Sequence, residues 1–361
     1  MSRTTAVAII VCLMAVAACS PDAAAGAPAS PTPVPSPAVP PAPTTTAPAA
    51  PSAAAATLAA GTALPVVADS DPRILYTHLT DAGGGVFLMR PDGMDVVQLA
   101  TDVHGNLKHS DWSADGQHAV FIDEATEKMW IAHLDGSPSE SIAACDTYGC
   151  DYPAWSPDGT KIAFSRYENK DGTTGPSAVG IYTVDLATGN VTTVVRLERP
   201  LLADVPRWSP DGTQIVFGVD RMDDGAYETG AAIAIVPAAG GQPRYLTGFE
   251  QFAYYPDWNR VTDEIVFSTE AIKYKKAPEP GDDTWNLYAI KLDGTGRRQI
   301  THVPAGKRLW NPTWTPDGTR ITAGFEDTRQ GAFVDPVSGE VEPFPPTDKM
   351  SRPRLRPSPA P

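Results

Sequence analysis

The residues of this chain with the widest chemical range are its six histidines, because an imidazole titrates near neutral pH and is the commonest metal ligand in proteins. His104, His109 and His302 fall where repeats of the sequence begin, so a repeating fold would bring them to one side of the molecule. Together they could hold a divalent metal. No two of them have the close spacing of a ligand motif, however, and solvated loop positions account for them better. The sequence therefore predicts no cofactor, with a divalent metal as the alternative.

The four cysteines are the other reactive groups, and Cys19 has the most telling surroundings. It ends the segment Val16-Ala17-Ala18-Cys19, which resembles a bacterial lipobox and follows Arg3 and the short apolar run Ala6–Ala17. That run is too short to span a bilayer permanently. The pattern predicts a signal peptide over residues 1–18, cleavage before Cys19, and lipidation of Cys19. Ordinary secretion is the alternative.

Cys145 and Cys150 form a second, closely spaced pair. Outside the cytosol, two cysteines this close are most simply a disulfide that closes one loop. Chain entropy gives such a short loop about 2 kcal/mol of stabilisation. A metal site is the alternative, but the sequence offers no partner ligands at suitable spacing. We therefore expect a disulfide.

Nucleophilic catalysis and nucleic-acid binding find little support. The sequence has no Gly-x-Ser-x-Gly elbow and no segment that reads as an α/β-hydrolase domain. The net charge of −15 argues against nucleic acid, since neutralising phosphates requires clustered Lys and Arg. These features favour a binding protein over an enzyme without excluding an enzyme.

The elements that must position these residues are repeats. Five tryptophans, spaced by 43, 53, 50 and 56 residues, lie in five near-copies of one phrase. The copies are Asp111–Gly116, Ala154–Gly159, Arg207–Gly212, Asp257–Arg260 and Thr313–Gly318. Each continues into short alternating apolar runs rather than a helical pattern. A repeat of this size made of strands is typical of a β-propeller blade.

Each phrase also predicts its own local structure. In Ser156-Pro157-Asp158-Gly159 the proline presets φ, the aspartate accepts backbone hydrogen bonds, and the glycine supplies a positive φ, which together predict a tight hairpin turn. One strand precedes the turn and ends on the tryptophan, and three strands follow it. Four strands make a blade, and the tryptophan is expected to wedge between neighbouring blades.

The two ends of the repeat region predict a closed ring. Residues 73–101 contain three strands without a preceding tryptophan strand. The tail Arg352–Pro359 reads like the missing strand, with Leu355 in place of the tryptophan. Such closure would cover edges that are otherwise exposed. We predict an all-β fold over residues 71–361: a six-bladed β-propeller of four-stranded blades closed by the C-terminal strand, with seven blades as the alternative.

These repeats resemble those of TolB-type six-bladed propellers, whose WD-like repeats also occur in the propeller domains of prolyl-oligopeptidase-type proteases. The resemblance is carried by the Trp-Ser-Pro-Asp-Gly phrases and covers roughly residues 73–358. It implies the fold but leaves the function open. Propellers of this type serve as docking platforms, as substrate gates and, in some relatives, as lyases.

Residues 19–70 would connect the lipid to the propeller. They are rich in Ala, Pro, Ser and Thr with almost no charged or aromatic residues, so they are expected to be disordered. At ~3 Å per residue the segment could reach on the order of 100 Å. The Ala and Pro richness suggests a high-GC bacterium. We expect a monomer, lipid-anchored on the extracytoplasmic side of the cell membrane.

Strand order assigns the loops to two faces of the propeller. The short turns belong to one face, and the other face carries three long insertions, Tyr167–Ser177, Asp220–Gly230 and Ala271–Thr284. Elaborated loops on a rigid scaffold often carry binding sites. Neutral length variation is the alternative.

The connections between blades on that elaborated face are aromatic, basic and polar. Tyr, Trp and Arg are preferred anchors of protein interfaces, and they suit stacking on sugars equally well. The candidate binding residues are Tyr152, Arg207, Tyr254, Tyr255, Arg308, Trp310 and Asn311. The predicted function is a platform for an envelope protein or a cell-wall polymer. The alternative is a metal-assisted polysaccharide lyase or hydrolase with its site in the central channel.

Overall fold

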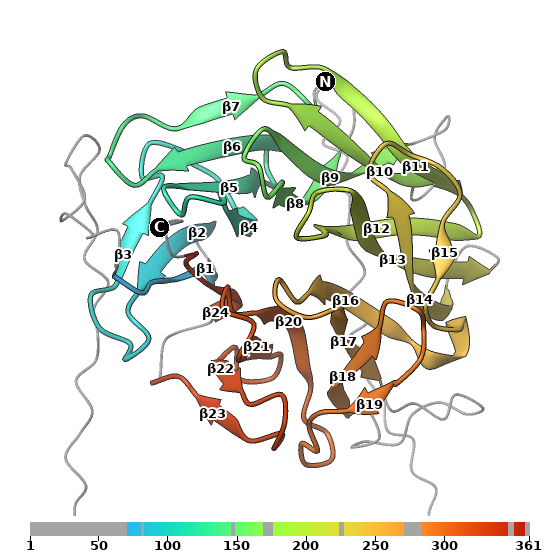
Figure 1. Ribbon diagram of the computed structural model, residues 1–361. Coiled ribbons are helices and arrows are strands. Elements are labelled where there is room, and N and C mark those ends of the chain that lie inside the picture. The colour runs from blue at the N-terminus through green and yellow to red at the C-terminus, as the bar shows by residue number, and fades with distance from the viewer. Residues whose placement is uncertain are drawn as a thin grey trace, which may run out of the picture. The chain divides into compact units, whose positions relative to one another are not determined.

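Six antiparallel sheets of four strands surround a common axis in the computed structural model (Figure 1). The prediction of an all-β, six-bladed propeller is confirmed, and the alternative of seven blades is wrong. The residues described are 71–80, 83–145, 149–168, 176–223, 227–270, 284–345 and 350–357. The predicted signal peptide, Cys19 and the linker to residue 70 lie outside these ranges. Within them, no helix has the length and apolar character needed to cross a membrane.

The blades are numbered along the chain, and each is given from its innermost strand outward. Blade 1 has β24 (Met350–Leu355), β1 (Ile74–Thr80), β2 (Gly83–Met89) and β3 (Val97–Leu99). Blade 2 has β4 (Leu107–Trp112), β5 (His118–Asp123), β6 (Lys128–His133) and β7 (Glu140–Ile142). Blade 3 has β8 (Cys150–Trp155), β9 (Lys161–Glu168), β10 (Ala178–Asp185) and β11 (Val191–Glu198).

The second half of the ring repeats this plan. Blade 4 has β12 (Leu201–Trp208), β13 (Gln214–Asp223), β14 (Tyr227–Pro237) and β15 (Arg244–Tyr245). Blade 5 has β16 (Ala253–Trp258), β17 (Glu264–Glu270), β18 (Trp285–Lys291) and β19 (Arg298–Gln299). Blade 6 has β20 (Leu309–Trp314), β21 (Ile321–Phe325), β22 (Gly331–Val334) and β23 (Val341–Pro343). A 3-10 turn, Phe249–Gln251, precedes blade 5.

The turn between the first two strands of a blade is held by the side chains predicted for it. In blade 3 the Ser156 hydroxyl donates to the Asp158 carboxylate at 2.6 Å and accepts the Lys161 N–H at 2.9 Å. Asp158 also accepts the Thr160 N–H at 3.0 Å, and Gly159 has a φ of 73°. Equivalent carboxylate contacts recur at Asp115, Asp211 and Asp317. We call the face with these turns the turn side and the opposite face the hairpin side.

The tryptophans pack between blades, as predicted. Trp112 at the end of β4 is buried with Leu75 of blade 1 and Phe121 of blade 2. Its indole N–H donates to the backbone oxygen of Arg354 in blade 1 at 3.0 Å. Trp208 makes the corresponding bond to Ala154 of blade 3, also at 3.0 Å. Each blade is therefore fixed to the one before it by burial and by a hydrogen bond.

The C-terminal strand closes the ring, which confirms the prediction. β24 pairs with β1 in antiparallel register from Ile74 opposite Leu355 to His78 opposite Met350. The strand begins two residues earlier than the predicted Arg352. Beyond its end, the guanidinium of Arg356 donates to the backbone oxygen of Gly116 in the blade 2 turn at 2.8 Å. The tail thus contacts the blades on both sides of the closure.

The hairpin side differs from the prediction in part. β13 and β14 remain paired as far as Asp223 opposite Tyr227, so most of the segment Asp220–Gly230 is a strand hairpin rather than a loop. Its polar residues do not alternate with apolar ones, because the extended part of the hairpin stands beyond the core, and the periodicity therefore missed it. Most of the predicted insertion after β17, residues 271–283, lies outside the described residues.

Candidate functional site at the propeller axis

One residue in every innermost strand has a left-handed backbone. The φ angle lies between 50° and 54° at His109, Tyr152, Val205, Tyr255, Asn311 and Arg352. At the same points the pairing with the second strand shifts register, which marks a β-bulge. A left-handed φ is strained for these residue types. Because the strain recurs in all six blades, it belongs to the architecture, and we call these six residues the axial ring.

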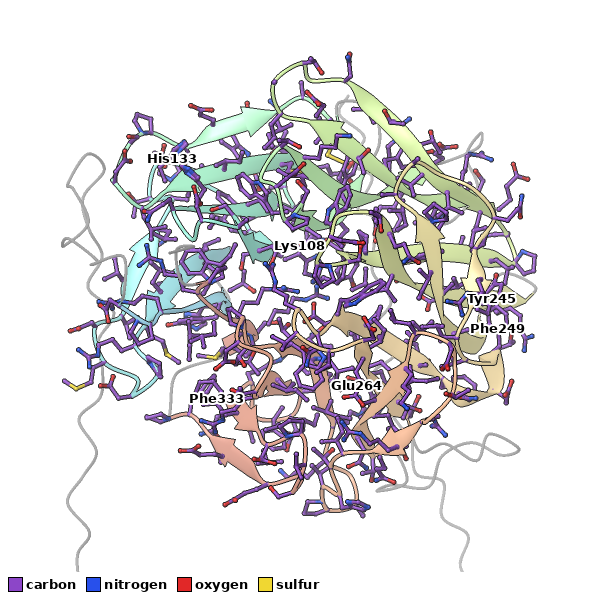
Figure 2. The ribbon with its side chains drawn as sticks, in the orientation of Figure 1. Lys108, His133, Tyr245, Phe249, Glu264 and Phe333 are labelled. Atoms are coloured by element: carbon purple, nitrogen blue, oxygen red, sulfur yellow. A yellow bond between two sulfur atoms is a disulfide. The ribbon has the colours of Figure 1, made fainter. Side chains whose placement is uncertain are left out.

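Side chains of the axial ring meet at its centre. The Arg352 guanidinium of blade 1 lies 4.2 Å from the ring centroid of Tyr152 in blade 3 and 5.5 Å from that of Tyr255 in blade 5. Since these are alternate blades, the three side chains converge on the axis, and we call them the axial plug. Arg352 is only 7% exposed. Figure 2 shows side chains filling the middle of the ring, with Lys108 among them.

Burial also fixes the ionisation of the plug's tyrosines. Loss of hydration raises the pKa of Tyr152 and of Tyr255 far above the ordinary value, although the positive charge of Arg352 opposes the shift. Both phenols are therefore neutral at physiological pH. They present rings to the guanidinium and hydroxyl groups that can donate or accept hydrogen bonds.

His109 is the one predicted histidine that lies at the axis. Its ring stacks on Tyr152 at 4.3 Å, and its Nδ1–H donates to the carboxylate of Asp151. The same carboxylate lies 3.3 Å from the Lys108 ammonium. Burial, followed by the positive charges of Arg352 and Lys108, holds the pKa of His109 well below its usual value. The imidazole is therefore neutral and has an unprotonated Nε2, which could accept a proton or a hydrogen bond.

The predicted histidines do not gather into a metal site. His104 and His302 are both exposed to solvent. The described part of the chain contains no group of three or more His, Cys, Asp or Glu residues that could hold a metal ion.

A cluster of four aromatic residues lies beside the plug toward the hairpin side. Tyr254 stacks on Trp285 with ring centroids 5.0 Å apart and planes at 15°. Tyr255 meets the edge of Trp310 at 6.0 Å and lies 6.5 Å from Trp285. All four side chains are half-buried. We call Tyr254, Tyr255, Trp285 and Trp310 the aromatic cluster.

Charged residues of both signs border the aromatic cluster. The guanidinium of Arg329 lies 5.4 Å from the Trp310 ring. Arg308 donates to the Glu326 carboxylate at 2.7 Å, and Lys307 pairs with Asp327. An apolar centre with a charged border has the composition of a protein interface.

On the turn side of the plug, the axis widens into a cavity that we call the axial chamber. Its charged lining consists of Asp111, Arg207, Asp257 and Arg354, with Arg260 among the residues that complete its wall. Arg354 lies 2.8 Å from Asp111, and Arg207 lies 3.6 Å from Asp257. The chamber is thus lined by two buried ion pairs.

Both chamber carboxylates also link neighbouring blades. Asp111 of blade 2 accepts the backbone N–H of Trp155 in blade 3 at 2.9 Å. Asp257 of blade 5 accepts the N–H of Trp314 in blade 6 at 2.7 Å. Their role in the fold is to tie one innermost strand to the next.

The candidate binding residues fall into two groups. Tyr152, Tyr254, Tyr255 and Trp310 are half-buried around the hairpin-side end of the axis, with Arg308 beside them. Arg207 and Asn311 are 8% and 6% exposed, so their placement as surface anchors was wrong. Except for Arg308, these residues lie within innermost strands rather than in connections, because each innermost strand already begins on the hairpin side. That they bind a partner stays a prediction.

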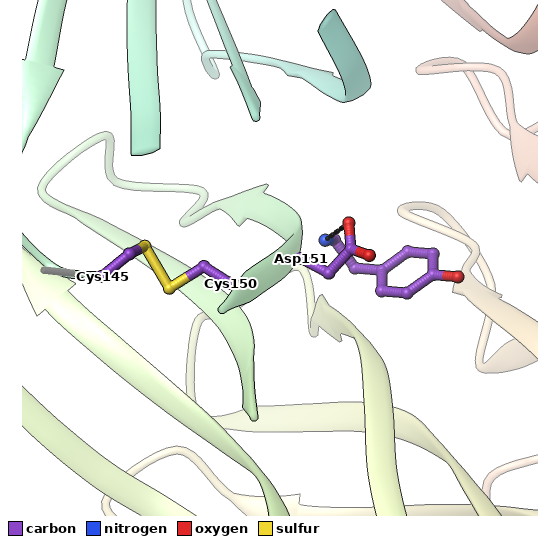
Figure 3. Close-up of a disulfide and its surroundings, with 4 residues drawn as sticks. Cys145, Cys150 and Asp151 are labelled. Carbon is purple, nitrogen blue, oxygen red and sulfur yellow. Dashed lines mark hydrogen bonds between the residues drawn. A yellow bond between two sulfur atoms is a disulfide. The ribbon is translucent and has the colours of Figure 1, made fainter. Parts of the chain in front are cut away.

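The disulfide between Cys145 and Cys150 is present at the entrance of blade 3 (Figure 3). Both cysteines are 4% exposed and pack in the core between blades 2 and 3. Cys150 opens β8, and the next two residues are Asp151 and Tyr152. The disulfide therefore fixes the start of the strand that supplies two residues of the axis.

Sequence reasoning missed Arg352, Asp151 and Trp285. A signal for the first was available: Arg352 stands three residues before Leu355, as Tyr152 and Tyr255 stand three residues before their tryptophans. Aligning all six repeats at this position would have listed the whole axial ring. Trp285 follows an insertion and has no equivalent in the repeats, so nothing in the sequence pattern indicated it.

Comparison with known proteins supports the same architecture. No family model matches the chain. TolB from Acinetobacter baumannii is similar in structure, with a TM-score of 0.58, 16% identity, and coverage of 80% of this chain and 67% of that one. The chain has the TolB-type propeller fold. A nidogen/laminin complex gives a TM-score of 0.58 at 9% identity, covering 79% of this chain and 98% of that one.

Two further matches are more limited. An oligogalacturonate lyase from Vibrio parahaemolyticus shares the TolB-type fold with a TM-score of 0.52 and 12% identity, covering 75% of this chain and 73% of that one. In sequence, the uncharacterized protein Atu1656 of Agrobacterium fabrum is 33% identical over 147 residues, which are 39% of this chain and 49% of that protein. The chain thus spans about half the length of the curated relative it matches.

Proposed function

We propose that this protein is an extracytoplasmic binding platform, anchored through a lipid on Cys19, that binds an envelope protein or a cell-wall polymer at the hairpin-side end of its axis. The observation that carries the proposal is the aromatic cluster, whose four half-buried rings contact one another beside the plug. Tyr and Trp offer large apolar contact areas and lose little conformational entropy on binding.

A protein partner fits this surface better than a polymer. Arg308, Glu326 and Arg329 give the cluster a border of both signs, which favours recognition of specific charges. The comparisons add support, since the nidogen structure that shares the fold is a complex with laminin. Aromatic rings also stack on sugars, so a wall polymer is the second expected class of ligand.

The lipid anchor and the compartment rest on the N-terminal sequence and on the cysteines. The Val16–Cys19 segment supports lipidation, and residues 20–70 supply a spacer long enough to hold the propeller away from a membrane. The Cys145–Cys150 disulfide supports a compartment outside the cytosol.

The platform is tested by binding of envelope extract and of purified cell wall to immobilised propeller. Tyr254→Ala and Trp310→Ala should each weaken capture of one specific ligand by about thirtyfold, the effect of losing a buried aromatic anchor. Lys161→Ala, on an exposed residue beside a turn, is the matched control and should bind as wild type. Thermal unfolding of each variant verifies the fold. Equal capture by all variants would remove the aromatic cluster from the proposal.

The anchor has its own test. Metabolic labelling with a fatty-acid analogue should tag the wild-type protein, and Cys19→Ser should abolish both the label and recovery in the membrane fraction. An unlabelled wild-type protein would instead assign ordinary secretion.

The lyase or hydrolase alternative stays a prediction with one point of support, the fold shared with an oligogalacturonate lyase. His109 is the residue through which it would act, because its unprotonated Nε2 lies at the axis. Incubating the purified protein with acidic polysaccharides and divalent metals, and following new double bonds by ultraviolet absorbance, tests it. Activity that His109→Ala abolishes would establish the alternative.

A further inference from the structure

The axial chamber and the plug bury more positive charge than negative. Arg207 and Arg354 line the chamber opposite Asp111 and Asp257, and Arg352 of the plug lies within electrostatic range of Arg207. The three arginines are 8%, 8% and 7% exposed. Three guanidinium groups thus face two carboxylates in a region that is largely closed to solvent, where an unbalanced charge is strongly unfavourable.

The two carboxylates are already engaged. Asp111 contacts Arg354 and the N–H of Trp155, and Asp257 contacts Arg207 and the N–H of Trp314. Within the described residues, the Arg352 guanidinium contacts two tyrosine rings and no carboxylate. The third cation therefore lacks a counter-charge.

Other carboxylates near the axis lie beyond the plug. Asp151 is bound by His109 and Lys108. Asp204 and Asp220 stand in the part of blade 4 where β12 begins and β13 ends, which is the hairpin side, and both are partly exposed. These groups face the hairpin-side mouth rather than the chamber.

Donor atoms in the chamber wall remain unused. The Nε atoms of Arg207 and Arg354 are buried and have no hydrogen-bond partner within the described residues. Burial and the neighbouring Arg354 lower the pKa of Arg207 to about 9, which expresses the same excess of positive charge. Two unpaired N–H groups beside an uncompensated cation are the donors that an anion requires.

We propose that the axial chamber binds one small monovalent anion, a halide or the carboxylate group of a small molecule, between the guanidinium groups of Arg207 and Arg354. The anion enters from the turn side, where Pro157, Pro210, Pro316 and Arg260 contribute to the lining. It balances the third arginine and accepts the two free N–H groups. This site lies across the plug from the aromatic cluster and is independent of the proposed platform.

Crystals of the propeller grown in sodium bromide test the site directly. The anomalous difference map should contain a bromide peak in the chamber within hydrogen-bond reach of Arg207 and Arg354. Bromide peaks confined to the outer surface, with none in the chamber, would overturn the halide form of the proposal. The same crystals transferred to sodium formate should then contain a planar density at this position if the ligand is a carboxylate. An empty or water-filled chamber in both salts overturns the proposal.

Chlorine-35 line broadening measures the same binding in solution at constant ionic strength, with formate as competitor. Arg207→Gln removes one donor and the excess charge, so halide affinity should fall at least about tenfold. Arg260→Gln, an exposed arginine of the same cavity, is the matched control and should keep wild-type affinity. Equal broadening by wild type and Arg207→Gln would overturn the assignment. Should Arg207→Gln fail to fold, the crystallographic result decides alone.

Discussion

The turn side and the hairpin side of this propeller are built on opposite plans. On the turn side, four blades repeat one hydrogen-bonded unit of Ser or Thr, Asp and Gly, and blade 5 replaces it with Asn259, which accepts the N–H groups of Val261 and Thr262. On the hairpin side, the axial ring has the same backbone in every blade but a different side chain in each. Repetition of side chains thus marks residues that hold the fold, and their divergence over a constant backbone marks residues free to bind.

Removal of residues 350–361 should give the largest effect on this contrast. It deletes β24, the Arg354–Asp111 pair, and the Arg356 bond to the blade 2 turn. Losing a whole strand should destabilise the propeller by more than about 5 kcal/mol, beyond any ordinary point substitution. Circular dichroism and urea unfolding measure it. Unchanged unfolding would mean that the closure contributes nothing to stability.

Asp257→Ala should come next in size. It leaves the buried Arg207 without its partner and the Trp314 N–H without an acceptor, a loss of about 3 kcal/mol. The control on the hairpin side is Lys307→Ala, which removes a partly exposed ion pair to Asp327 and should change stability by less than about 1 kcal/mol. Chemical denaturation of both variants compares them. Equal losses would break the distinction between the two sides.

Reduction of the disulfide should have a smaller effect. Opening the Cys145–Cys150 loop should lower the free energy of unfolding by about 2 kcal/mol through chain entropy. Because the loop leads into Asp151 and Tyr152, ligand binding at the axis should weaken as well. A Cys145→Ser, Cys150→Ser double variant, measured by thermal unfolding without reductant, should match the reduced wild type. A wild-type protein whose thiols alkylate before reduction would refute the disulfide.

The smallest effect should come from a single turn. Hydrogen bonds from the Ser156 hydroxyl and the Thr160 N–H hold the pKa of Asp158 below its ordinary value. Since the folded pKa is the lower one, the stabilisation is complete above about pH 4 and is lost as pH falls through the folded pKa. Asp158→Asn should therefore be less stable than wild type by under about 1 kcal/mol at pH 7, because solvent screens this exposed group. Urea unfolding should show the two proteins converging near pH 2, and a constant difference at all pH values would contradict this account.

The fold was readable in the sequence because its determinants are local and repeated. The tryptophan spacing, the Ser-Pro-Asp-Gly turns and the tryptophan-like position of Leu355 each act within a few residues, and the structure bears out all three. The aromatic anchors Tyr254, Tyr255 and Trp310 were also readable, since they stand just before tryptophans or the strands that end on them.

The axial chamber was not readable, and the reason is the bulge. The register shift around Val205 reorients the strand, so Arg207 faces the buried channel instead of an open surface. The residues that meet at the axis, such as Arg352 and Tyr152, come from blades far apart in the chain. A pattern within one repeat shows where a residue stands along a strand but not which residue of another blade it meets.

The pairing of β1 also decides how the propeller responds to mechanical load. β1 is the first strand of the described chain, yet β24 and β2 flank it with backbone ladders on both sides. Tension on the residues before Asp71 therefore reaches an interior strand and must shear two ladders at once. An edge strand in that place would unzip one bond at a time. A tether attached at this end pulls on one of the most firmly held strands of blade 1.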